Sequence, residues 1–210
     1  MAGFMMGKSN LIYSLKWNFE LEQPFAKIND IKTLSRGESF FRADFEIAMP
    51  QNRLVRLDHF VKGWMKNRLI EAFTYHYEDN LLQKRDCVNL RTSSKWYNEY
   101  IYNDLKELDR INVYISHSGS NDFLPSSYSL FYYDSQKRKT LRKILKADGE
   151  LSSYEVFHYE NDKLNKMEMF DCENDKLFTE VYRHSENGEI QQIDYFDRDG
   201  NYERSLSTEL

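Results

Sequence analysis

A short polar segment, residues 117–122, holds residue types that general-base and nucleophilic chemistry requires. It reads His-Ser-Gly-Ser-Asn-Asp, so a histidine base stands beside two serine hydroxyls. A run of small polar residues is equally typical of an exposed loop. The sequence contains no Gly-rich phosphate loop, no HExxH, no GxSxG and no zinc-type cysteine pair. We therefore interpret the segment as a loop and assign no catalytic residue.

Histidine and aspartate also alternate at one position of a sequence repeat, at His158, Asp171, His184 and Asp197. Both residue types bind metal ions. Neighbouring strands of an up-and-down sheet run in opposite directions, so the two histidines would lie at one end, about 10 Å apart. The two aspartates would lie at the other end. Because metal–nitrogen bonds are only about 2 Å long, we expect no metal site and no cofactor.

The repeat of 13 residues defines the elements that would position these side chains. Each member has Asn or Asp, then Gly or Asp, a polar residue and an apolar residue: DGEL at 148–151, NDKL at 161–164, NDKL at 174–177, NGEI at 187–190 and, after 12 residues, DGNY at 199–202. Asn, Asp and Gly tolerate the left-handed backbone of tight hairpin turns. About nine residues remain for each strand. Residues 148–205 are therefore predicted to form a regular acidic β-meander.

The same alternation extends toward the N-terminus. Apolar residues alternate with polar ones in runs such as 73–77 and 111–115, which predicts antiparallel strands through most of residues 38–147. The fold class is therefore mostly β, a long antiparallel up-and-down meander in a single domain of 210 residues. Such a meander either closes as a barrel or stays an open curved sheet. Both alternatives remain open at this point.

Two segments predict short helices rather than strands. Residues 1–37 are expected to form an N-terminal strand followed by a helix over 24–36, where apolar residues recur every three positions between Pro24 and Gly37. Residues 95–109 fit both a strand and a helical face, and we favour a helix there.

The composition is that of a folded chain with a substantial core. It contains 15 Tyr, 14 Phe and 3 Trp, and aromatic side chains pack well on pleated sheets. No secretory signal and no apolar run long enough to span a bilayer are visible, so the expected location is the cytoplasm, without a membrane partner. Cys87 and Cys172 are far apart in sequence and are expected to be free thiols.

The net charge of −5 hides a marked asymmetry along the chain. Residues 148–210 contain 17 acidic and 6 basic side chains, whereas the rest of the chain contains 17 acidic and 23 basic ones. An acidic sheet surface favours a basic protein partner, because complementary potentials steer encounter. The predicted binding residues are four carboxylates and three aromatic anchors expected to be exposed: Glu155, Glu168, Glu180, Asp194, Tyr182, Tyr195 and Phe196.

The turn sequences carry a resemblance to known repeat families. The segments YENDKL at 159–164 and SENGEI at 185–190 resemble the turn signature of MORN-like repeat antitoxins and the YD repeats of Rhs-type bacterial proteins. The resemblance covers residues 130–205. It departs from both families in its period of 13 and in two turns with Asp in place of Gly. It implies a bacterial protein–protein module, such as an immunity protein or antitoxin, and transfers no catalytic residue.

Three functions from different classes follow. The first is a non-enzymatic protein-binding module that neutralises a basic toxin. The second is a β-barrel that binds a small apolar molecule among Tyr154, Phe157, Phe170 and Tyr182. The third is an enzyme whose site residues are dispersed along the sequence. Nucleic-acid binding through the aromatic residues 96–102 and the basic run 137–146 is disfavoured by the acidic net charge.

Overall fold

The computed structural model describes residues 9–18, 23–28, 31–46, 53–64, 66–116, 120 and 122–207. These residues divide into two compact units, one up to Lys95 and one from Trp96 onward. Both units consist of antiparallel strands in nearly sequential order. The helical structure in the described residues is a single 3-10 turn, η1 (Ile31–Thr33), in the first unit. The prediction of a mostly β, antiparallel meander is confirmed.

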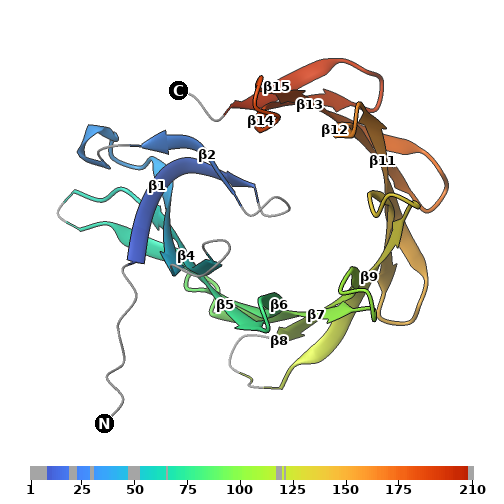
Figure 1. Cartoon of the computed structure of the whole chain (residues 1–210). Coiled ribbons are helices and arrows are strands. Elements are labelled where there is room, and N and C mark those ends of the chain that lie inside the picture. The colour runs from blue at the N-terminus through green and yellow to red at the C-terminus, as the bar shows by residue number, and fades with distance from the viewer. Residues whose placement is uncertain are drawn as a thin grey trace, which may run out of the picture. The chain divides into compact units, whose positions relative to one another are not determined.

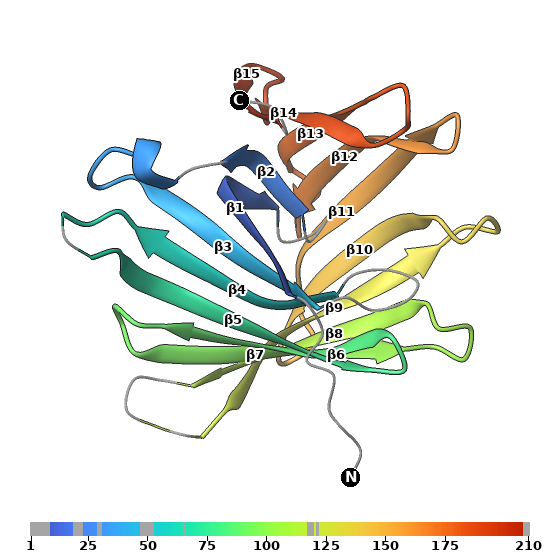
Figure 2. The same ribbon diagram turned by 60° about the vertical axis from the view of Figure 1, so that its left-hand side comes forward.

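The strands in chain order are β1 (Ser9–Asn18), β2 (Gln23–Ile28), β3 (Ser39–Glu46), β4 (Arg53–Val61), β5 (Arg68–Glu78), β6 (Leu81–Asn89), β7 (Ser94–Tyr102), β8 (Leu108–Ser116), β9 (Leu124–Tyr133), β10 (Lys139–Lys146), β11 (Leu151–Glu160), β12 (Lys163–Asp171), β13 (Lys176–His184), β14 (Ile190–Asp197) and β15 (Tyr202–Ser207). In the first unit they pair in the order β6-β5-β4-β3-β1-β2, so β1 lies between β3 and β2 (Figure 2). In the second unit the order β7 to β15 follows the chain, from green to red (Figure 1).

The helix predicted over residues 24–36 is wrong. β2 occupies the first part of this segment, up to Ile28, and pairs with β1, with Pro24 opposite Trp17. Pairing with β1 satisfies the backbone groups on the inner side of β2, whereas a short isolated helix is only marginally stable. β2 is the outer strand of its unit, where the missing N–H of proline is tolerated. Only η1 retains a helical turn.

The helix favoured over residues 95–109 is also wrong. Asn98 and Tyr100 are buried in β7 while Glu99 and Ile101 are exposed, which is the period of two of a strand. A helix over residues 95–109 would include Leu105 in its apolar face. Leu105 instead lies in the β7–β8 turn with its side chain largely exposed.

Six hairpin turns of the second unit share one five-residue geometry. In each, the first residue donates its N–H to the fifth carbonyl, and the fourth residue donates to the first carbonyl: residues 103–107, 134–138, 146–150, 171–175, 185–189 and 197–201. The fourth residue has a positive φ in all six, whether it is Gly, Asn or Lys. In four of them, an Asn or Asp at the first position accepts hydrogen bonds from backbone N–H groups within the turn.

The two NDKL sequences fold into different turns. Asn161 and Asp162 both have positive φ, at 50° and 62°, and form a two-residue hairpin turn. In the second copy only Asn174 has a positive φ, at 69°, because it is the fourth residue of a five-residue turn. The side chain of Asp171 selects this longer turn by accepting the N–H groups of residues 173 and 175. The residues that precede the NDKL sequence in the chain therefore decide which type of turn it forms.

A side chain near the end of β5, β9, β11 and β13 contacts a backbone carbonyl of the preceding strand. The Tyr77 hydroxyl donates to the Leu54 carbonyl at 3.0 Å, and the Tyr159 hydroxyl donates to the Lys139 carbonyl at 3.0 Å. Tyr133 makes the same contact with the Leu108 carbonyl at 2.8 Å. His184 Nε2 lies 2.7 Å from the Leu164 carbonyl, so a histidine takes the place of tyrosine in the last of these contacts.

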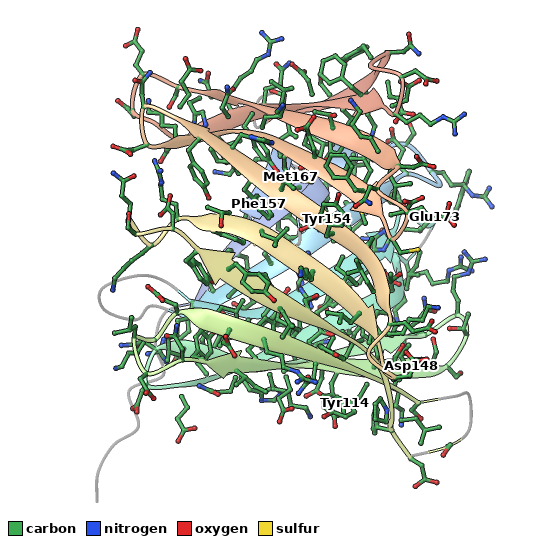
Figure 3. The ribbon with its side chains drawn as sticks, turned by 90° about the vertical axis from the view of Figure 1, so that its right-hand side faces the viewer. Tyr114, Asp148, Tyr154, Phe157, Met167 and Glu173 are labelled. Carbon is green, nitrogen blue, oxygen red and sulfur yellow. The ribbon has the colours of Figure 1, made fainter. Side chains whose placement is uncertain are left out.

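Apolar side chains lie on both faces of the second unit. Phe157 pairs with Met167 on one face, and both are buried (Figure 3). Tyr154 stacks on Phe170 on the opposite face, with ring centroids 5.1 Å apart. The core of each strand pair is therefore small, and cross-strand polar contacts supplement it. Among the described residues, no helix has the length and apolar character needed to cross a membrane.

We predict that the fourth turn position is limited by backbone conformation. Gly149 has φ +94°, and the nearest atom to an added Cβ is the Tyr128 hydroxyl at 3.6 Å, so space is available. Gly149→Ala should still destabilise the chain by about 1 kcal/mol, because L-residues disfavour positive φ. Asn174→Gly, the reverse change at the same position of another turn, should be neutral or stabilising. Urea unfolding of both variants measures this, and equal effects of the two changes would contradict it.

Candidate functional site

Two of the four predicted binding carboxylates are buried within the second unit. Glu155 lies 3.3 Å from Arg142 Nη1 on the neighbouring strand β10. Asp194 lies 2.7 Å from Arg183 Nε on β13 and also accepts hydrogen bonds from Ser205 and Gln192. Both carboxylates are therefore engaged inside the sheet. Their role in partner binding stays a prediction. Because both side chains are buried, little of either carboxylate is accessible to a partner.

The other two carboxylates also make cross-strand contacts. Glu168 lies 2.9 Å from His158 Nε2 and 3.1 Å from Lys166 Nζ. Burial would raise the pKa of Glu168, but these two neighbours hold it below its usual range. Glu180 accepts a hydrogen bond from the Tyr182 hydroxyl at 2.5 Å. The strand faces of the second unit thus carry largely neutralised charge.

The predicted aromatic anchors are packed against their neighbours. Tyr182 is buried, so the expectation that it is exposed is wrong. Burial, followed by the nearby Glu180 carboxylate, raises the pKa of Tyr195 to about 12, and Arg204 lies 4.7 Å above its ring. Phe196 packs edge-on against Tyr202 at 5.9 Å. Of this group, Tyr202 is the ring that reaches solvent, at 61% exposure.

The basic run at 137–146 explains why the charge asymmetry leaves the strand faces neutral. Most of it forms β10, which pairs directly with the acidic β11. Arg138 binds Asp134 and Asp162, and Arg142 binds Glu155. The basic strand and the acidic meander therefore neutralise each other within one sheet.

Exposed carboxylates remain at three alternate turns, which we name the acidic turn surface: residues 146–150, 171–175 and 197–201. Antiparallel order places alternate turns at one end of the sheet, and Figure 3 shows Asp148 and Glu173 at the same end. These 15 residues carry seven carboxylates and two basic side chains, Lys146 and Arg198. Asn201 and the turn N–H groups lower the pKa of Asp197, which keeps it ionised.

Apolar side chains are exposed beside the acidic turn surface. Leu177 follows the second turn with 42% of its surface exposed, and Tyr202 follows the third with 61% exposed. Exposed Tyr beside charged groups is typical of protein interfaces. Sequence reasoning missed this surface because it assigned the acids to the strand faces. The available signal was the Asp or Glu at each turn of the 13-residue repeat.

The alternating His and Asp residues have separate structural partners. His158 contacts Glu168, and both ring nitrogens of His184 face backbone carbonyls, those of Leu164 and Gly188. Asp171 and Asp197 cap turns. In the part of the chain that the structure describes, no three His, Cys, Asp or Glu residues are grouped closely enough to hold a metal ion.

The aromatic residues of the ligand-binding alternative lie on two faces. Tyr154 and Phe170 stack on one face, whereas Phe157 and Tyr182 lie on the other. They therefore do not line one cavity together. An open surface pocket lies instead beside the β11–β12 turn, lined by polar side chains: Glu160, Asn161, Lys163, Asn165 and His184.

Two further sequence expectations concern reactive side chains. The polar segment 117–122 lies largely outside the described residues, so its interpretation as a loop stays a prediction. Cys87 is buried and free, and burial raises the pKa of its thiol, which keeps it protonated. Cys172 is free and exposed in the second turn of the acidic turn surface.

Comparisons with known proteins leave the family open. No protein-family model matches the sequence, and no curated protein matches it. Among solved structures, the chain is similar to a porin-like protein from Bacteroides uniformis, with 10% identity and a TM-score of 0.42 over 83% of this chain and 91% of that chain. It is also similar to TcdB2-TccC3, with 11% identity and a TM-score of 0.21 over 91% of this chain and 12% of that chain. These TM-scores carry no argument about function.

We predict a pH-dependent contribution from Asp194. Burial alone would raise the pKa of Asp194, but hydrogen bonds from Ser205, Gln192 and Arg183 lower it further than burial raises it. A lowered folded-state pKa stabilises the fold above the unfolded value of about 4 and loses that effect as the pH falls through the folded-state value. Asp194→Asn should therefore cost about 2 kcal/mol at neutral pH and less in acid.

Urea unfolding near pH 7 and near pH 3 measures this difference. Glu203→Gln, which removes one exposed carboxylate, is the control and should change stability little at either pH. An Asp194→Asn deficit that is the same at both pH values would contradict the assignment.

Proposed function

We propose that this chain is a non-enzymatic protein-binding module whose acidic turn surface binds a basic protein. The supporting observation is the distribution of paired and exposed charge in the second unit. Strand-face carboxylates such as Glu155 and Asp194 are engaged by neighbouring strands. The carboxylates of Asp148 and Glu173 are instead exposed at the turns, and so is that of Asp199, which lies 3.8 Å from the exposed side chain of Arg198.

The geometry suits a protein partner. Alternate strands lie about 10 Å apart, so the three turns form a row about 20 Å long. Five-residue turns with internal hydrogen bonds hold the backbone that carries these carboxylates in place before binding, which reduces the entropy lost on association. Leu177 and Tyr202 supply apolar contact beside this charge. A basic toxin, as expected from the resemblance to repeat antitoxins, is the partner class that we propose.

The charge-reversal variant Glu173→Lys/Asp175→Lys/Asp199→Lys tests this proposal. It changes exposed turn residues whose side chains cap no turn, so the fold should persist. The matched control, Asp104→Lys/Glu186→Lys/Glu189→Lys, makes the same change in net charge at exposed turn residues of the opposite end. Circular dichroism of both variants verifies folding.

Binding is measured by capture from a cell extract at about 0.05 M and about 0.3 M salt, followed by titration of the captured protein. We expect the wild type and the control to bind one basic protein, and the variant to bind it at least about tenfold more weakly. High salt should reduce binding by the wild type. Equal binding by wild type and variant, or an equal loss in variant and control, would contradict the proposal.

A further inference from the structure

The β4–β5 turn of the first unit presents a tryptophan to solvent. Trp64 is 83% exposed, the largest exposure among the large apolar side chains that the structure describes. Arg36 lies over its ring, with the guanidinium carbon 5.9 Å from the ring centroid. Trp64 contributes little to the core. Exposed tryptophan side chains are typical of binding interfaces, because the ring is large and apolar and its N–H is polar.

Basic residues lie on the two adjacent segments that hold this tryptophan and Arg36. Arg36, Lys66 and Arg68 are exposed, and Lys62 is half-buried, and together with Trp64 they define the Trp64 patch. The two segments that form it, residues 31–38 and 61–68, contain five basic residues and one acidic residue, Glu38. The Glu38 carboxylate accepts a hydrogen bond from the Ser35 N–H. The patch therefore carries positive charge in a chain whose net charge is negative.

The local fold holds the Trp64 patch in place. Lys62 N donates to the Glu38 carbonyl at 2.9 Å, and Gly37 N donates to the Lys62 carbonyl at 3.0 Å, so the two segments are bonded to each other. Lys62 Nζ donates to the Ile31 carbonyl of η1 at 3.0 Å. A Cβ at position 63 would lie 1.9 Å from the Lys66 carbonyl oxygen, so the turn that carries Trp64 requires glycine.

We propose that the Trp64 patch docks onto an anionic phospholipid surface. Tryptophan partitions into the headgroup region of bilayers, because its ring is apolar and its indole N–H is polar. Clustered Lys and Arg are attracted to anionic headgroups. Single-stranded nucleic acid usually requires a row of stacking aromatics along a basic groove, whereas Trp64 is the single aromatic residue of the two segments.

This contact differs from membrane spanning. The expectation of no membrane partner rested on the lack of a long apolar run, which bears on spanning only. The Trp64 patch belongs to the first unit and the acidic turn surface to the second, so the two proposals rest on different residues.

Vesicle flotation tests the proposal, with phosphatidylcholine vesicles that contain either no anionic lipid or about 30% phosphatidylserine. We expect the wild-type chain to float with the anionic vesicles and not with the neutral ones. Trp64→Ala and the charge reversal Arg36→Glu/Lys66→Glu should each weaken binding at least about tenfold. Leu105→Ala, at an exposed apolar residue of a turn in the second unit, is the matched control and should bind as wild type does.

Tryptophan fluorescence gives a second readout. Anionic vesicles should shift the emission of the wild type to shorter wavelength, and Trp64→Ala should abolish that shift. The variant with reversed acidic turns should bind vesicles at least as tightly as wild type, so failure of one proposal is distinguishable from failure of the other.

Several outcomes would overturn lipid docking. These are lack of flotation by a folded wild type, equal flotation with neutral vesicles, and flotation unchanged by Trp64→Ala. Tighter Trp64-dependent binding of an oligothymidine than of vesicles would assign the patch to nucleic acid. Concentration-dependent dimerisation abolished by Trp64→Ala, without vesicle binding, would assign it to a second copy of the chain.

Discussion

The structure depends on pairing charged side chains across neighbouring strands. A meander with apolar residues on both faces has a thin core, so many of its interior positions are polar. Asp58 shows the constraint most clearly, because its side chain has no exposed surface and is bound by Arg42 of the neighbouring strand β3 and by Arg56 of its own strand. A carboxylate buried in this way without a cationic partner would be strongly destabilising. Similar cross-strand pairs recur in the second unit at Arg142–Glu155 and Arg183–Asp194.

This constraint connects the sequence asymmetry to the proposed function. A basic β10 is adjacent to an acidic β11, so the two opposite charge runs of the sequence neutralise each other within the sheet. Turn residues have no strand partner on their outer side, and their carboxylates remain exposed. The charge that remains for an external protein is therefore concentrated at the turns. The same argument applies with opposite sign to the Trp64 patch, whose four basic residues lie at one turn and its neighbouring segment.

Hairpin repetition could be predicted from the sequence because turn chemistry is local. Asn, Asp and Gly at fixed spacing identified the turns of residues 148–205, and the strands between them are confirmed. Turn type was not predictable from the repeated letters, since NDKL folds in two ways according to whether an aspartate such as Asp171 precedes it. The helix predicted over residues 95–109 failed because the apolar spacing fits either period, and the one over 24–36 failed because a spacing of three in so short a segment does not fix a helix. Pairing with a neighbouring strand then decided the outcome.

The sequence predicts that the candidate site is acidic, but it does not predict that the exposed carboxylates lie at the turns. Alternation along β11 correctly separates Glu155 from Tyr154, but it does not state which face is covered. Glu155 is buried because Arg142 lies directly opposite it in register, a contact between strands that local sequence does not specify. Tyr182 was expected to be exposed for the same reason and is buried opposite Ile193. The turn sequences indicate where the chain reverses, and they do not by themselves indicate that their carboxylates form a shared surface.

A double-mutant cycle on Arg142 and Glu155 tests most directly whether pairing between neighbouring strands neutralises the charged side chains on the strand faces. Free energies of unfolding are measured for the wild type, Arg142→Met, Glu155→Gln and the double variant. The structure predicts a coupling free energy of at least about 1 kcal/mol, because the Glu155 carboxylate is buried against Arg142. A coupling of about zero would show that the two side chains act independently, and would contradict the account that cross-strand pairing neutralises the strand-face charges.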